Sequence, residues 1–195
     1  WVNDNERVFP VIIDPTIKVN TSDIFHMHVT KDIGNDTPCT MTQKTLYASI
    51  EKNVNGEVFS QNIYANIKSQ KISPSIRSKI YKACVTLNIE SISGDYKTVV
   101  LKVSKNNVII KRLSGNKDLK KIEIDVTNEV RSGSNVDIEL AFEYNSSMQS
   151  YYTRYTFYTP LADEPNCSCI ILEYNEQDIV NTKEYSIGNG GTTSV

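Results

Sequence analysis

Strict alternation of apolar and polar residues recurs along this chain and restricts its fold more than any other feature. In residues 81–89 the apolar side of the pattern consists of Tyr81, Ala83, Val85, Leu87 and Ile89. In residues 136–144 it consists of Val136, Ile138, Leu140, Phe142 and Tyr144. Residues 122–127 and 169–174 alternate in the same way. Because side chains alternate across an extended backbone, these segments predict strands with one buried face, typical of antiparallel sheets.

Turn residues separate the predicted strands. Asn55-Gly56 predicts a hairpin between residues 46–50 and 58–67, and Asn106-Asn107 predicts a turn between residues 99–104 and 108–113. One short helix is expected over residues 128–131, with Thr127 as its cap and Gly133 as its stop. Short strands with regular turns predict an all-β fold, an antiparallel β-sandwich or jelly roll with at most one short helical turn.

Composition agrees with a folded domain and restricts its partners. The chain has 195 residues, 39% of them hydrophobic, with a mean hydropathy of -0.36. No apolar run approaches the roughly 20 residues of a membrane span. The formal net charge is -2, and the basic residues are scattered apart from Lys111-Arg112 and residues 117–121. We therefore expect no membrane span and no nucleic-acid partner.

The two ends differ from the middle of the chain. Residues 8–17 form a short apolar strand broken by Asp14-Pro15, and we expect it to pair at a sheet edge or to cross between domains. The predicted organisation is a junction strand in residues 1–17, a sandwich in residues 18–180 and a linker in residues 181–195. The abrupt start at Trp1, with no signal peptide, predicts a piece cut from a longer precursor.

Several segments, taken in order, resemble one bacterial family. Phe-Pro-Val-Ile-Ile-Asp-Pro-Thr in residues 9–16 is followed by residues 72–89, by Ile-Asp-Val-Thr in residues 124–127, by residues 136–144 and by residues 165–174. This order resembles the DNRLRE-type domains of bacterial wall-associated and Rhs (YD-repeat) proteins. The chain departs from the family pattern in residues 18–45.

The resemblance implies a jelly roll similar to carbohydrate-binding modules. It also implies a secreted or cell-surface protein of the bacterial cell wall, and it implies no catalysis. The residues agree with the last expectation, because no Gly-x-Ser-x-Gly motif, phosphate-binding loop or evident acid–base pair occurs. We therefore expect a non-enzymatic protein.

The most distinctive surface candidate is the aromatic segment 151–158. As a strand it would place Tyr152, Arg154 and Tyr158 on one face, with Tyr151, Tyr155 and Phe157 on the other. Aromatic rings stack on the apolar face of a sugar, and arginine donates hydrogen bonds to its hydroxyls. The candidate ligand-binding residues are therefore Tyr152, Arg154 and Tyr158. An aromatic ladder that only stabilises the sheet explains the same residues.

Metal binding has two weaker candidates. Asp32, Asn35 and Asp36 offer oxygen ligands for Ca²⁺ in a glycine-containing loop, but they lack EF-hand spacing. A solvated turn accounts for them more simply than a calcium site does. His26 and His28 would share a strand face, but no third zinc ligand is evident. We expect no cofactor, with Ca²⁺ as the one ion left open.

The four cysteines are Cys39, Cys84, Cys167 and Cys169. Their even number would allow two disulfides, and their spacing matches no zinc finger. A bond between Cys167 and Cys169 would be strained on one strand. The pattern favours free thiols, with disulfides or a metal as alternatives.

Two hypotheses for function follow from these observations. In the first, the chain is a binding or adhesion module that contacts polysaccharide or cell-wall glycan through the aromatic face. In the second, it is a structural or assembly domain that packs against neighbouring domains of the same polypeptide.

Overall fold

The chain folds as an antiparallel β-sandwich. The computed structural model describes residues 16–19, 23–31 and 43–175. Its strands are β1 (Thr16–Val19), β2 (Phe25–Lys31), β3 (Thr45–Lys52), β4 (Val58–Lys68), β5 (Ile80–Gly94), β6 (Leu101–Lys105), β7 (Val108–Leu113), β8 (Lys121–Asp125), β9 (Asn135–Phe142), β10 (Tyr151–Tyr158) and β11 (Cys169–Tyr174). The predicted all-β class is confirmed.

The strand order is that of a jelly roll with three additional strands. Sheet I has the order β1-β11-β5-β8, and sheet II has the order β2-β4-β9-β6-β7. Without β2, β3 and β10, the remaining strands pair as β1-β11-β5-β8 and β4-β9-β6-β7, the two four-stranded sheets of a jelly roll. The pair β3 and β10, here called the β3–β10 extension, joins the end of β5 to the start of β4.

Two rows of apolar side chains, one from each sheet, form the core between the sheets. Sheet I contributes Ala83, Val85, Leu87, Ile122, Ile124, Ile170 and Leu172. Sheet II contributes Phe25, Met27, Ile63, Ala65, Ile67, Leu101, Val103, Val136, Ile138 and Leu140. Their burial follows the alternation seen in the sequence, so hydrophobic contact between the inner faces stabilises this arrangement.

Two residues predicted on the apolar face of their strands are exposed. Tyr81 is exposed, because the pairing of β5 with β11 shifts register between Glu173 and Tyr174 and places buried Ile80 opposite Tyr174. Tyr144 is also exposed, because β9 ends at Phe142 and the chain leaves the sheet. The expected inward positions of Tyr81 and Tyr144 are therefore wrong.

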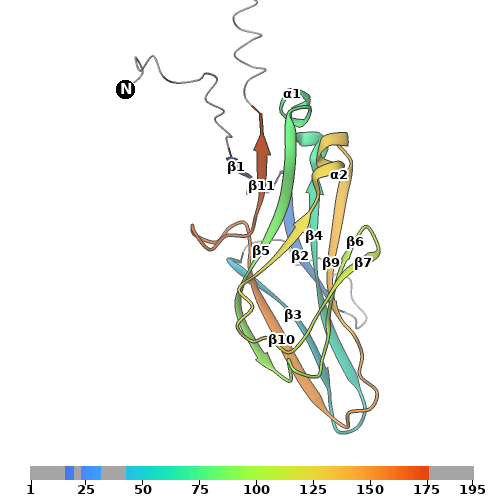
Figure 1. Cartoon of the computed structure of the whole chain (residues 1–195). Helices are drawn as coiled ribbons and strands as arrows, with labels where there is room; N and C mark the ends of the chain where they lie inside the picture. Colours follow the sequence, from blue (N-terminus) through green and yellow to red (C-terminus); the bar gives the residue numbers. More distant parts are fainter. Residues whose placement is uncertain (1–15, 20–22, 32–42, 176–195) are drawn as a thin grey trace, which may run out of the picture.

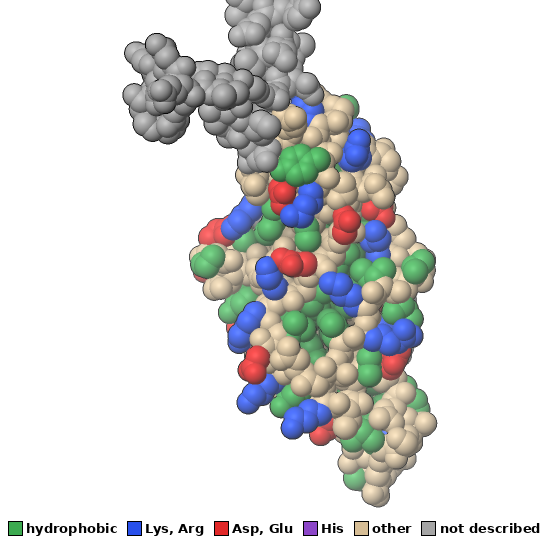
Figure 2. Space-filling model, viewed as in Figure 1, with side chains coloured by type: hydrophobic (Ala, Val, Ile, Leu, Met, Phe, Trp, Pro, Cys, Tyr) green, Lys and Arg blue, Asp and Glu red, His purple; other side chains and the backbone are tan. Residues whose placement is uncertain are grey.

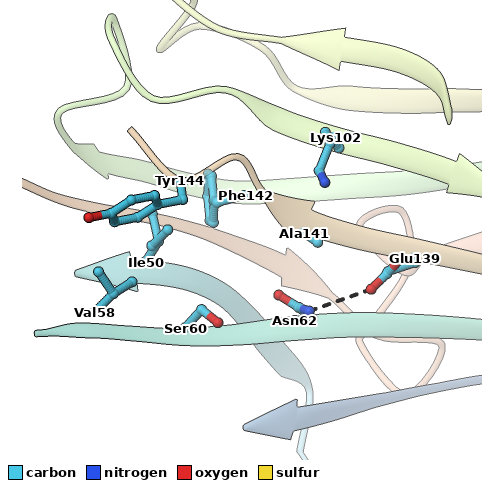
Figure 3. Close-up of a pocket in the computed structure, with 9 residues that line it drawn as sticks. All are labelled: Ile50, Val58, Ser60, Asn62, Lys102, Glu139, Ala141, Phe142 and Tyr144. Atoms are coloured by element: carbon cyan, nitrogen blue, oxygen red, sulfur yellow. Dashed lines mark hydrogen bonds between the residues drawn. The ribbon is translucent and has the colours of Figure 1, made fainter. Parts of the chain in front are cut away.

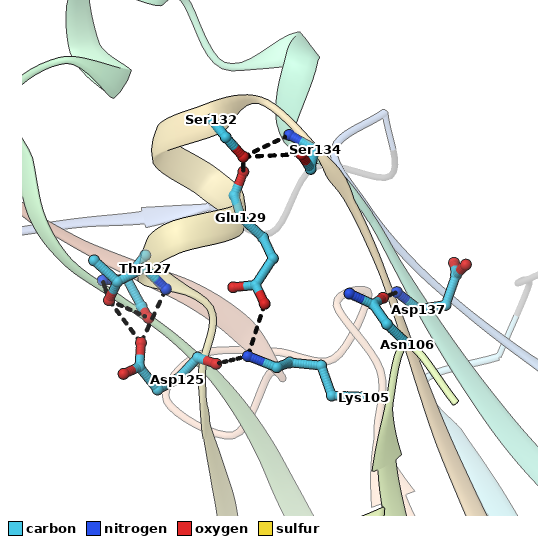
Figure 4. Close-up of polar contacts among 9 residues, drawn as sticks. Lys105, Asn106, Asp125, Thr127, Glu129, Ser132, Ser134 and Asp137 are labelled. Atoms are coloured by element: carbon cyan, nitrogen blue, oxygen red, sulfur yellow. Dashed lines mark hydrogen bonds and ion pairs between the residues drawn. The ribbon is translucent and has the colours of Figure 1, made fainter. Parts of the chain in front are cut away.

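The predicted turns form as expected. Gly56 has a φ of 85° in the β3–β4 hairpin, and Asn106 and Asn107 have φ values of 49° and 65° between β6 and β7. The Asn106 side chain also accepts a hydrogen bond from the backbone N–H of Asp137 on β9 at 2.9 Å. This bond fixes the β6–β7 turn against the neighbouring strand (Figure 4).

The predicted helix is present as α2 (Thr127–Ser132), but its start differs from the prediction. Its N-cap is Val126, and the carboxylate of Asp125 accepts hydrogen bonds from the Thr127 backbone N–H and hydroxyl at 2.9 and 2.6 Å (Figure 4). The capping role assigned to Thr127 is thus wrong. These two bonds hold the pKa of Asp125 below its usual value. Gly133 ends the helix with a φ of 77°, as predicted.

Two further helical turns connect β4 to β5. They are the 3₁₀ turn η1 (Ser69–Lys71) and the helix α1 (Pro74–Arg77), which begins with Ser73 as its N-cap. With α2 they exceed the expected maximum of one short helical turn. Figure 1 shows α1 and α2 at one end of an elongated molecule and the β3–β10 extension at the other.

The described part of the junction strand lies at a sheet edge. Thr16 and Ile17 begin β1, which continues to Val19 and pairs with β11 at the end of the sheet order. This agrees with the expected edge position of residues 16–17. Residues 8–15 and the predicted linker at 181–195 lie outside the described residues.

Candidate functional site

The aromatic strand β10 has one buried and one half-buried face. Tyr151, Thr153, Tyr155 and Phe157 are buried, whereas Tyr152, Arg154, Thr156 and Tyr158 are half-buried. The predicted division between the two faces is therefore confirmed. Tyr155 packs against Phe142 of β9, with ring centroids 5.6 Å apart, so the inner face is anchored in the core. The outer face is left to contact other molecules.

Strand β3 brings further side chains to this outer face. Its register with β10 places Tyr47 opposite Thr156, Ser49 opposite Arg154, and Glu51 opposite Tyr152. The guanidinium carbon of Arg154 lies 4.2 Å from the Tyr47 ring centroid and 5.6 Å from that of Tyr152. Both distances are within the range of cation–π attraction, so the two rings hold the guanidinium in place.

These residues border a hollow of about 220 Å³. We call it the aromatic hollow and define it by Tyr47, Glu51, Phe59, Gln61, Tyr152 and Arg154. Strand β4 contributes Phe59 and Gln61, because β4 pairs with β3 through Glu51 opposite Phe59 and Ser49 opposite Gln61. The hollow therefore combines three rings, one cation, one carboxylate and one amide from three adjacent strands.

The polar side chains of the hollow differ in their hydrogen bonding. The Gln61 side-chain amide donates a hydrogen bond to the Tyr47 backbone carbonyl oxygen at 2.7 Å, which fixes the Gln61 side chain against β3. The Nε of Arg154 is shielded from solvent and has no hydrogen-bond partner within the described residues. Buried donors are normally paired, so the unpaired Nε distinguishes Arg154 from Gln61.

Two rings are open to solvent. Tyr47 is 36% exposed and Phe59 is 44% exposed, although both belong to strands of the sandwich. A planar ligand with an apolar face could stack on them while its polar groups reach Glu51 and Arg154.

The predicted residue Tyr158 lies apart from this hollow. It is on the same face of β10 as Tyr152 and Arg154, but it pairs with Thr45 at the far end of the strand and does not border the hollow. Its carbonyl oxygen accepts a hydrogen bond from the Ser168 hydroxyl at 2.6 Å. The structure thus brings two of the three predicted residues together.

The histidines lie on the outer face of sheet II. His28 stacks on Tyr64 with ring centroids 5.4 Å apart, and its centroid is 5.7 Å from that of His26. Burial lowers the pKa of both histidines. The charge of Lys68 lowers the pKa of His26 further, and the charge of His26 lowers that of His28 further. Within the part of the chain that the structure describes, no three metal-binding side chains cluster.

The other candidates divide between described and undescribed residues. The possible Ca²⁺ ligands Asp32, Asn35 and Asp36 lie outside the described residues, as does Cys39. Cys84, Cys167 and Cys169 are free thiols. Burial raises the pKa of Cys84 and Cys169, so both remain protonated at neutral pH.

Charge is dispersed over the surface shown in Figure 2. Lysine, arginine and acidic side chains are interspersed there rather than gathered into one patch. Several form exposed ion pairs, such as Lys82 with Glu173 at 2.6 Å and Lys44 with Asp163 at 2.7 Å. Among the described residues, no helix is both long and apolar enough to cross a lipid bilayer.

No model of a known protein family matches this chain, and no curated protein does either. The fold and the side chains of the candidate site therefore carry the functional argument.

Sequence reasoning missed Tyr47, Glu51, Phe59 and Gln61. Residues 45–52 do alternate, with Leu46, Ala48 and Ile50 buried and Tyr47 exposed between them. That signal could have placed Tyr47 on an outer face. It could not have placed the ring beside Arg154, because the contact depends on the pairing of strands far apart in the chain.

Proposed function

We propose that this chain is a non-catalytic binding module that holds glycans in the aromatic hollow. The observation that carries the proposal is the Arg154 guanidinium, 4.2 Å and 5.6 Å from the ring centroids of Tyr47 and Tyr152, in a hollow that the open ring of Phe59 also borders. A pyranose presents an apolar ring face and a rim of hydroxyl groups. The rings would stack on the former, and Arg154 and Glu51 would bind the latter.

The hollow favours a neutral sugar. Arg154 donates hydrogen bonds, whereas the Glu51 carboxylate accepts them, so a hydroxyl can bind to either side chain. The two groups together suit a ligand that both donates and accepts hydrogen bonds. Figure 1 shows that the β3–β10 extension forms one end of the molecule, where a polysaccharide chain can approach.

The proposed setting is a secreted or cell-surface protein of a bacterial cell wall. It rests on the ordered resemblance of residues 9–16, 72–89, 122–133, 136–144 and 165–174 to DNRLRE-type domains of wall-associated and Rhs proteins. The jelly-roll strand order is compatible with this resemblance.

The test is binding of the purified chain to an array of wall and host polysaccharides, followed by calorimetry with the best ligand. Tyr47→Ala, Tyr152→Ala and Arg154→Ala should each weaken binding by about tenfold or more, since each removes a stacking ring or a charged donor. Tyr158→Ala, on the same face but outside the hollow, is the matched control and should bind normally. Binding to no polysaccharide, or equal losses for all four variants, would refute the proposal.

A structural or assembly domain is the second candidate, and strand β7 favours it. β7 ends the sheet order, and Val108, Ile109 and Ile110 are 64, 40 and 38% exposed. An apolar edge strand can pair with a neighbouring domain of the same polypeptide. This candidate predicts that flanking segments of the polypeptide bind the chain and that Ile109→Lys weakens that binding, whereas Arg154→Ala has no effect.

A further inference from the structure

A second depression lies between β4 and β9, and Ser60 is the one residue that lines both it and the aromatic hollow. β4 pairs with β9 through Ile63–Lys68 and Asn135–Leu140, whereas its first residues pair with β3 instead. β4 therefore leaves β9 as it approaches the hairpin, and a cleft of about 500 Å³ opens where the two strands separate (Figure 3). We call it the β4–β9 cleft.

A small side chain forms the floor of this cleft. Ala141 of β9 lies opposite Lys102 of β6 in the sheet register, and Asn62 of β4 borders the cleft from the other side. Because the alanine methyl group is much shorter than its neighbours, a depression remains between them. A larger residue at position 141 would fill it.

The two ends of the cleft differ in chemistry. Phe142 and Tyr144 border one end, and Tyr144 is 52% exposed, with the Lys52 ammonium 5.5 Å from its ring centroid. Asn62, Lys102 and Glu139 border the other end (Figure 3). A ligand that fits both ends needs an apolar face and polar substituents, which is the character of a sugar ring.

The charged side chains at and beside the polar end differ in whether they already have hydrogen-bond or ion-pair partners. Glu139 Oε1 already accepts a hydrogen bond from the Tyr64 hydroxyl at 2.8 Å and one from the Asn62 amide at 3.5 Å. Arg112, opposite Lys102 on β7, pairs with Glu143 at 2.8 Å. Lys102 itself forms no ion pair with any described residue. Its ammonium group is thus available to an anionic ligand group, while Tyr64 and Asn62 bind Oε1 of the Glu139 carboxylate at the same end.

We propose that the β4–β9 cleft binds a saccharide that carries a carboxylate, such as a uronate residue. The sugar ring lies against Tyr144 and Phe142, its hydroxyls reach Asn62, and its carboxylate pairs with the Lys102 ammonium. This site is distinct from the aromatic hollow, because the two share Ser60 alone, with Phe59 and Gln61 of β4 in the hollow and Val58 and Asn62 in the cleft.

The experiment compares a galacturonate trisaccharide with the neutral galactose trisaccharide of the same linkage, by NMR titration of the isotope-labelled chain at low salt. The acidic sugar should shift the amide signals of Ala141, Phe142 and Tyr144. It should also bind about tenfold more tightly than the neutral one, and added salt should reduce the difference. Equal affinity for the two sugars, or shifts confined to other residues, would overturn the proposal.

Three variants separate this site from the other. Lys102→Gln should remove the preference for the acidic sugar, and Ala141→Leu should weaken binding of both sugars by filling the cleft. Lys97→Gln, an exposed lysine outside the cleft, is the charge control and should bind normally. Amide spectra establish that each variant is folded. If Ala141→Leu does not fold, the effect of Lys102→Gln on the preference for the acidic sugar tests the proposal by itself.

Arg154→Ala distinguishes failure of this proposal from failure of the glycan function proposed above. It should leave binding of the acidic sugar to the cleft unchanged, because Arg154 belongs to the aromatic hollow. If Arg154→Ala abolishes that binding while Lys102→Gln preserves it, the acidic sugar occupies the hollow and the cleft proposal is wrong.

Discussion

Asp95 and Tyr152 form two reciprocal hydrogen bonds. The backbone N–H of Asp95 donates to the Tyr152 carbonyl oxygen at 2.6 Å, and the Tyr152 N–H donates to the Asp95 carboxylate at 2.9 Å. Asp95 immediately follows β5, whereas Tyr152 is near the start of β10. The pair therefore extends the β5–β10 pairing past the end of β5 and holds the backbone of a residue that borders the aromatic hollow.

Loss of the Asp95 carboxylate should disturb this end of the hollow. In Asp95→Ala the Tyr152 N–H loses its acceptor, and we expect the free energy of unfolding to fall by about 1 kcal/mol. Urea denaturation measures this change, and calorimetry with a bound glycan measures the effect on affinity. Asp95→Asn keeps an oxygen acceptor and should behave more like the unaltered chain. Equal stability of Asp95→Ala and the unaltered chain would show that the bond contributes nothing.

Gly94 should tolerate no side chain. Its φ is 84°, and a Cβ atom there would lie 1.9 Å from the Tyr152 carbonyl oxygen. Because the obstruction is backbone, Gly94→Ala should lower the free energy of unfolding by at least about 2 kcal/mol. Gly115→Ala is the matched control, since Gly115 has a similar φ of 77° but no atom within 4 Å of its added Cβ. Similar losses for the two variants would mean that the close approach to Tyr152 is unimportant.

The buried hydroxyl of Ser168 should stabilise the junction between β10 and β11. It accepts a hydrogen bond from the Asn88 N–H at 2.9 Å and donates one to the Tyr158 carbonyl oxygen at 2.6 Å. Ser168→Ala leaves both part-buried backbone groups without that partner, so we expect a loss of about 1–3 kcal/mol in the free energy of unfolding. Thermal and urea unfolding should show this loss, while exposed Ser150→Ala stays unchanged. A neutral Ser168→Ala would contradict the bridging role.

Stability should decline in mild acid because of the histidines on sheet II. Burial lowers the pKa of His26 and His28 in the folded chain, and Lys68 and His26 lower it further, while Asp137 opposes the shift at His28. Below the unfolded value of about 6.5, the unfolded chain therefore binds more protons than the folded one. Above pH of about 6.5 these two histidines should not change the free energy of unfolding. As the pH is lowered from about 6.5 towards the lower pKa of the folded chain, the free energy of unfolding should fall.

Urea denaturation at a series of pH values measures this dependence. His28→Asn should reduce the slope below pH of about 6.5, because it removes one titrating ring and its repulsion of His26. Tyr81→Phe, on the other sheet, should keep the slope of the unaltered chain. A His28→Asn profile identical to that of the unaltered chain would contradict the assignment.

Local pattern predicted most of the strands and turns. Residues 136–142 and 151–158 alternate in the sequence, and their burial alternates in the structure. The predictions failed at Tyr81 and Tyr144, where a register shift and a strand end interrupt the alternation. Neither event leaves a mark in the adjacent sequence, because both depend on how a strand meets its neighbour.

The candidate site was predictable only in part. The face shared by Tyr152 and Arg154 follows from their spacing along one strand. The ring of Tyr47 that stacks on Arg154 comes from β3. The pairing of β3 with β10 joins residues that are far apart in the chain, and a local sequence pattern cannot predict such a pairing. The β4–β9 cleft was likewise beyond prediction, since it forms where β4 changes partner.

The sequence by itself determined which residues are extended, which side of each strand is apolar, and where the chain turns. These are local properties, because side-chain direction alternates with every residue and glycine or asparagine adopts the positive φ that tight turns need. The tertiary structure alone decided that β3 lies beside β10, that Arg154 lies between two rings, and that Lys102 faces an open cleft. Those outcomes depend on which distant strands pair and pack with one another. Because many strands of this chain alternate in the same way, their sequences would also allow other pairings.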